Sequence, residues 1–169
     1  MSIFKLPNIP IAGEINSEMT KQVCFSLSEL EAKKVKKLRI DINSPGGDVE
    51  DGIAIAVRIK NSPIHITTYG LGQVASSGLV VFSAGNRRIM SPYCMALFHE
   101  ISAEVPGEKI SNLQLALSHY ENDNKRMIQL LADYSGVEKK VWSHLISIKN
   151  DYFFDAKKAL ELGFIHGIK

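Results

Sequence analysis

The sequence is poor in cysteine, which excludes a disulfide-stapled scaffold and most zinc-binding modules. Only Cys24 and Cys94 occur, both inside apolar stretches. There is no CxxC pair and no cluster of histidines and cysteines at the spacing of metal ligands. We therefore expect both cysteines to be small core residues, and we expect no metal and no organic cofactor.

Long apolar runs are also missing. The longest, around residues 79–84, is far shorter than the about 20 residues that a helix needs to cross a bilayer. The first ten residues, MSIFKLPNIP, lack the basic region and continuous apolar segment of a secretory signal. These absences predict no membrane association and a location in the cytoplasm.

Neither sign of charge is in excess, because 20 basic residues against 18 acidic ones leave a net charge of +2. The one dense basic run consists of lysines 33, 34, 36 and 37. It is expected to be the solvated carboxyl end of a helix, where cations are favourable. Nucleic acid is not an expected partner, since binding it requires a concentrated basic face.

The first half of the chain alternates strands with helices. Helices are expected at 18–33 and from 48 to about 60, and short strands at 38–43, 64–69, 88–90 and 95–99. This order predicts an α/β fold of βαβ units with a largely parallel sheet. Because no linker or repeat interrupts it, residues 1–169 are expected to form a single domain.

The second half is rich in helix, with helices expected at 110–134 and 137–147. In the first of these, residues spaced alternately by four and three form a seam of about three heptads. Such a seam could pack on its own domain or on another subunit. Asp155 is expected to cap a last helix that Gly163 ends. The seam consists of Leu113, Leu117, Tyr120, Asn124, Met127, Leu131 and Tyr134.

Two short segments follow strands and precede helices. In GQVASSG (72–78), Ser76 lies among small side chains at the start of an apolar helix, whose unpaired N–H groups could stabilise a developing oxyanion. In NSPGGD (43–48), Gly46 and Gly47 leave backbone N–H groups uncovered, so a substrate could approach closely. Taken singly, each segment is better explained by close packing or by a turn that Asp48 caps.

Two further residues could complete a catalytic set. His99 ends a predicted strand and precedes a polar loop, a position that can face a cleft. Asp151 precedes three aromatic residues and is therefore expected to be partly buried, where an ionised carboxylate needs a partner. A histidine N–H would serve as that partner. A turn or capping role is the alternative for Asp151.

Together these segments resemble the proteolytic subunit of Clp protease, over residues 10–168. INSPGG (42–47) matches the glycine turn of that family, GQVASSG is similar to its nucleophile segment, and DYFFDAKKALELG (151–163) to its aspartate segment. The order serine, histidine, aspartate differs from that of chymotrypsin, subtilisin and the α/β-hydrolases.

The resemblance implies a serine endopeptidase. Ser76 would be the nucleophile, His99 the base and Asp151 the group that orients it, with the N–H groups of Gly47 and Ser77 as oxyanion hole and Gly46 with Gly47 as substrate-binding residues. The implied fold is a ClpP/crotonase-like spiral of βαβ units with a protruding helical handle, residues 110–134. Implied partners are peptides or unfolded polypeptides and copies of the chain itself, in one or two seven-membered rings.

The sequence departs from the family pattern at several positions. Ser77 replaces a usual methionine, Glu100 a common glutamine, and Lys149 with Asn150 replaces an acidic residue and an arginine that pair between rings. Compared with the family, the amino-terminal segment that forms axial pore loops is expected to be missing or reduced, which leaves docking to an AAA+ unfoldase open. Three alternatives remain: a silent scaffold subunit, a phage-type capsid maturation protease, and an acyl-CoA enzyme of the crotonase fold.

Overall fold

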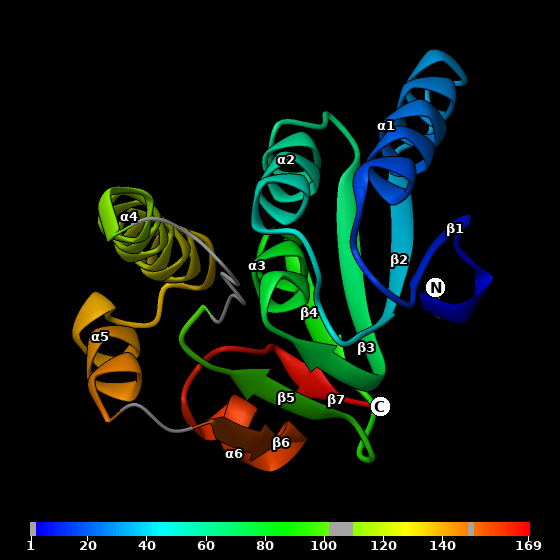
Figure 1. Ribbon diagram of the computed structural model, residues 1–169. Coiled ribbons are helices and arrows are strands. Elements are labelled where there is room, and N and C mark those ends of the chain that lie inside the picture. The colour runs from blue at the N-terminus through cyan, green and yellow to red at the C-terminus, as the bar shows by residue number, and fades with distance from the viewer. Residues whose placement is uncertain (1–2, 102–109, 149–150) are drawn as a thin grey trace.

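A seven-stranded sheet forms the centre of the computed structural model, which describes residues 3–101, 110–148 and 151–169 (Figure 1). Parallel strands follow the order β1 (Asn8–Ala12), β2 (Lys37–Ser44), β3 (His65–Ala75), β4 (Arg87–Met90) and β7 (Gly167–Ile168). β5 (Met95–Phe98) is parallel to the last part of β3 and antiparallel to β6 (Tyr152–Asp155). The predicted α/β class with a largely parallel sheet is confirmed.

The helices lie close to their predicted positions. A short 3-10 helix, Ile3–Lys5, precedes β1. Side-chain oxygens of Asn16, Asp48 and Asp155 accept from backbone N–H groups three residues later and so fix where three helices begin. Gly163 follows the last helix with φ 72°, as a helix-ending glycine should. The helices are α1 (Ser17–Ala32), α2 (Val49–Lys60), α3 (Ser77–Ser83), α4 (Ile110–Ser135), α5 (Lys139–Ser147) and α6 (Ala156–Glu161).

The helices from α1 to α5 pack in sequence, each against the next. Figure 1 shows α4 and α5 set to one side of the sheet, beyond α3, while α6 lies beside β5 and β6. One cluster of buried apolar side chains extends from Ile9 to Ile165 and includes residues of every helix from α1 to α6. Among the described helices none is both long and apolar enough to cross a membrane.

The seam on α4 divides into two parts. Met127 and Leu131 are buried in the core, whereas Leu113 and Leu117 are exposed. The carboxyl-terminal half of the seam therefore packs on its own chain. The leucines of the amino-terminal half are not covered by any other part of the described chain. α4 corresponds to the helical handle that was predicted at 110–134.

Some local predictions need correction. β6 and β7 were not expected as strands, because a strand of four residues or two shows no recognisable alternation and depends on distant partners.

Of the two cysteines that were expected in the core, only Cys94 is buried, and burial raises the pKa of its thiol to about 12. Cys24 is only half-buried. The lysines at 33, 34, 36 and 37 are exposed after the end of α1, as predicted.

Candidate active site

Three loops meet at one edge of the sheet, because β2, β3 and β5 are parallel neighbours and their carboxyl ends point the same way. The glycine turn follows β2, Ser76 follows β3, and His99 follows β5. In open α/β sheets this is the edge where ligands bind. The sheet order therefore brings together segments that are far apart in the sequence.

Ser76 occupies the sharp turn between β3 and α3. Its backbone has φ 54° and ψ −127°, a conformation that costs a residue with a side chain about 1–3 kcal/mol. The Ser76 N–H donates to the Leu97 carbonyl at 2.9 Å, which ties the turn to β5. A strained strand-to-helix turn of this kind exposes a serine hydroxyl in other hydrolases, and Ser76 is partly exposed here.

The glycine turn is held in place from both sides. Gly46 accepts from Ile15 N–H at 2.8 Å and donates to Ser44 Oγ at 3.0 Å. Asp48 N–H donates to the Ile15 carbonyl at 2.9 Å. Gly46 is buried and both of its backbone polar groups are engaged, whereas Gly47 is exposed and its N–H has no acceptor among the described residues. In this turn, Gly47 is the residue whose N–H is available to a ligand.

Both glycines are required by the packing. The backbone of Gly46 has φ +96° and that of Gly47 has φ +146°. A Cβ added to Gly47 would lie 2.2 Å from the Ile15 carbonyl oxygen. Ser77 approaches from α3 and donates its hydroxyl to the Gly47 carbonyl at 3.2 Å. That bond was not foreseen, since only the backbone N–H of Ser77 had been considered.

His99 is the first residue after β5 and is half-buried. Its Nδ1 lies 2.6 Å from the Glu100 carbonyl oxygen. A carbonyl oxygen only accepts, so this contact requires the hydrogen on Nδ1, and in the neutral imidazole the lone pair is then on Nε2. That is the tautomer in which a histidine can remove a proton from a serine hydroxyl.

Asp151 lies one residue before β6, and His99 lies one residue after β5. Phe98 pairs with Tyr152 at the end of the antiparallel β5 and β6, so His99 and Asp151 are each one residue from that pair, but among the described residues no hydrogen bond or ion pair joins their side chains. The expectation of partial burial is wrong, because Asp151 is exposed. Of the aromatic residues that follow, Phe154 turns into the core while Phe153 faces outward, so they do not enclose the carboxylate.

A cavity of about 250 Å³ joins the serine and the histidine. Ser76 and His99 line it together with Gly47, and the remaining lining residues are Pro45, Val49 and Ile101. Sequence reasoning identified the three polar contributors. It missed Val49 and Ile101, whose apolar character is no different from that of core residues.

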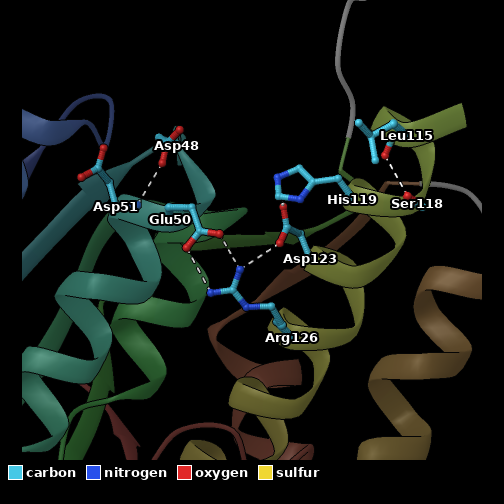
Figure 2. Close-up of polar contacts among 8 residues, drawn as sticks. All are labelled: Asp48, Glu50, Asp51, Leu115, Ser118, His119, Asp123 and Arg126. Atoms are coloured by element: carbon cyan, nitrogen blue, oxygen red, sulfur yellow. Dashed lines mark hydrogen bonds and ion pairs between the residues drawn. The ribbon is translucent and has the colours of Figure 1, made fainter. Parts of the chain in front are cut away.

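Two polar residues of α4 make contacts at or next to the site. Asn124 is buried and accepts from Ile101 N–H at 3.0 Å. Arg126 binds both carboxylate oxygens of Glu50, at 2.5 and 3.0 Å, and also contacts Asp123 (Figure 2). The hydrogen bonds from Arg126 hold the pKa of Glu50 below its ordinary value. Asn124 had stood out in the sequence as the polar member of the seam, which was the one signal that could have indicated this contact.

Other predicted positions lie outside this part of the structure. Most of the polar loop 100–109, and Lys149 with Asn150, fall outside the described residues. No group of three or more histidine, cysteine, aspartate or glutamate side chains within the described ranges could hold a metal ion.

A sequence model of the Clp protease family matches residues 2–169. The chain belongs to the Clp protease family. It is 29% identical over 158 residues to the ATP-dependent Clp protease proteolytic subunit 1 of Corynebacterium jeikeium, covering 92% of this chain and 82% of the relative. It is 30% identical over 169 residues to the proteolytic subunit 3 of Rhizobium etli, covering 99% and 86%.

The fold comparison agrees with this membership. A structure of a ClpP1 point mutant from Listeria monocytogenes superposes with a TM-score of 0.85 at 25% identity, covering 96% of this chain and 90% of that one. The predicted Clp-type spiral of βαβ units is confirmed.

Proposed function

We propose that this chain is a serine endopeptidase that hydrolyses peptides or unfolded polypeptides. The observation that carries the proposal is one cavity lined by Ser76 on its strained turn, by His99, and by Gly47, whose N–H has no acceptor among the described residues. Family membership supports the same reaction class.

In the proposed mechanism, His99 Nε2 takes the proton of Ser76 Oγ as that oxygen attacks the peptide carbonyl. The N–H groups of Gly47 and Ser77 donate to the oxyanion of the tetrahedral intermediate, a contribution of about 2.7–4 kcal/mol for one donor. His99 then gives the proton to the leaving amine. Water, deprotonated by His99, hydrolyses the acyl-enzyme and restores Ser76.

Asp151 has the role of stabilising the imidazolium that forms on His99. The strand register supports this role, because each of the two residues is one position from the last pair of β5 with β6, Phe98 with Tyr152. The Glu100 carbonyl holds Nδ1–H in the resting state, but a neutral carbonyl stabilises a cation less than a carboxylate does. Gly46, whose polar groups are engaged, would contact substrate only through its Cα surface.

Assembly into a homo-oligomer is part of the proposal. Leu115 is 72% exposed and Leu117 61% exposed on the amino-terminal half of α4, and a strip of exposed leucines usually marks an interface. We infer that a second copy of the chain covers it, in seven-membered rings that enclose the active sites. Docking of an AAA+ unfoldase, the single-domain boundaries 1–169 and a cytoplasmic location stay predictions.

The experiment that tests the function is hydrolysis of fluorogenic peptides by the wild type and by Ser76→Ala. The proposal expects turnover in the wild type and none above background in the variant. A silent scaffold subunit would give background rates for both proteins. A capsid maturation protease would cleave one defined site in preference to unfolded casein, whereas the proposed enzyme degrades casein at many sites.

A further inference from the structure

One peptide group links α4 to the catalytic histidine. The carbonyl of Glu100 accepts from His99 Nδ1 at 2.6 Å, and the N–H of Ile101 donates to Asn124 Oδ1 at 3.0 Å. The Glu100 carbonyl and the Ile101 N–H belong to the same planar peptide unit. Asn124 therefore fixes the plane whose other end holds the imidazole.

The position of Asn124 makes this contact costly to lose. Asn124 is only 8% exposed and lies on the face of α4 that carries the buried Met127 and Leu131. A buried amide without a hydrogen bond is unfavourable by roughly 1–3 kcal/mol. An apolar residue would pack at this seam position without that cost, so the amide is explained by the group to which it binds.

A second contact fixes the position of α4 relative to the cavity. Arg126, two residues after Asn124, binds Glu50, which directly follows the lining residue Val49 (Figure 2). Ile101 also lines the cavity. α4 therefore binds two sides of the cavity. Arg126 binds α2 through Glu50, and Asn124 binds the segment after His99 through Ile101.

We propose that Asn124 is a positioning residue for His99, acting through the Glu100–Ile101 peptide. Hydrogen bonds in such a chain polarise one another, so the bond to Asn124 strengthens the carbonyl as an acceptor for Nδ1–H. The imidazole is held in its Nδ1–H tautomer, which leaves Nε2 for Ser76 on the other side of the shared cavity. This inference rests on the proposed function, in which Ser76 and His99 carry out the reaction.

The test compares Asn124→Leu, which keeps the approximate size and removes the acceptor, with Asn124→Asp, which keeps an oxygen acceptor. The matched control is Asn122→Leu, the same change at an exposed position of α4. We expect Asn124→Leu to lower kcat roughly 10- to 100-fold with little change in KM, since small displacements of a catalytic group have effects of that size. Asn124→Asp should recover most of the loss, and Asn122→Leu should match the wild type.

Two further measurements make the result decisive. The rate at which a fluorophosphonate labels Ser76 reports nucleophile activation without peptide binding, and it should fall in parallel with kcat. Should Asn124→Leu not fold, Asn124→Ala leaves room for a water to accept from Ile101 N–H, and a smaller loss in the same direction is expected. A folded Asn124→Leu or Asn124→Ala with the wild-type kcat and labelling rate would overturn the inference. A wild type that is not labelled at all would instead refute the proposed function.

Discussion

Gly46 and Ser76 are packed so closely that a Cβ on Gly46 would lie 2.6 Å from the Ser76 Cβ and 2.8 Å from the Ala75 carbonyl oxygen. Real Cβ atoms do not approach other atoms so closely, so a side chain here must displace the turn that carries the serine. The glycine turn and the nucleophile turn thus form one packed unit, although a strand and a helix separate them in the sequence.

We therefore expect Gly46→Ala to have a larger effect on kcat than on the free energy of unfolding. Displacing Ser76 by about 1 Å is expected to lower kcat on the order of 100-fold. Gly163→Ala is the matched control, because Gly163 also has a positive φ, 72°, but a Cβ there would meet nothing within 4 Å. It should lose about 1–2 kcal/mol of stability from its left-handed backbone and keep its kcat. Equal losses of activity in the two variants would show that backbone strain, not the contact with Ser76, is the cause.

Asp151→Asn tests the orienting carboxylate. We expect folding to be intact and kcat to fall about 10⁴-fold, the usual cost of this change in a serine protease. Asp155→Asn, the same substitution four residues later, should leave kcat unchanged, since an asparagine also caps a helix. An activity of Asp151→Asn within a few-fold of the wild type would assign the orienting role to the Glu100 carbonyl instead.

Leu117→Asp tests the assembly. Because Leu117 is exposed on α4, the substitution should leave the subunit folded while splitting the particle into smaller species in native mass spectrometry. Leu131→Asp is not a comparable probe, because Leu131 is fully buried in its own core and the change should unfold the chain. An active wild-type monomer at micromolar concentration would contradict the assembly.

Glu31→Gln is a prediction about stability alone. Hydrogen bonds from Arg58, at 2.8 and 2.7 Å, and then from Ser62 hold the pKa of Glu31 below its ordinary value of 4.5. The ionised form is therefore favoured by folding, and its contribution is present above pH 4.5 and is lost as the pH falls through the lowered pKa.

Urea unfolding measures this effect. At neutral pH, Glu31→Gln should be less stable than the wild type by about 0.5–1 kcal/mol, as for a partly exposed ion pair, and the difference should shrink below pH 4.5. Glu29→Gln, at an exposed position of the same helix, should show no difference at either pH. A stability gap for Glu31→Gln that is constant from neutral to acid pH would rule out the ionised carboxylate as its source.

Much of the fold could be predicted because its signals are local. Asp155 and Gly163 bracket α6 as their residue types require, and the alternation of short apolar strands with helices gave the parallel sheet. The β6 strand could not be predicted, since its four residues depend on pairing with β5, which lies more than fifty positions earlier. The same pairing determines where Asp151 lies, so the exposure of Asp151 could not be predicted from the sequence either.

The candidate site was only partly predictable for a similar reason. Ser76, His99 and Gly47 carry chemistry that residue type and position at strand ends can indicate. Asn124 acts through a hydrogen bond to the backbone of a residue with no chemistry of its own, Ile101. The polar residue in an otherwise mostly apolar seam marks Asn124 as unusual, but no sequence pattern identifies its partner, because the partner depends on how α4 packs beside the loop after β5.

The measurement that tests the account most directly is mass spectrometry of the chain after treatment with a fluorophosphonate probe. We predict one adduct per chain, on Ser76, that is absent from Ser76→Ala and strongly reduced in His99→Ala, because the serine depends on the histidine for activation. Labelling of Ser77 instead, or labelling of Ser76 that is unaffected by loss of His99, would contradict the assignment of Ser76 and His99 as nucleophile and base.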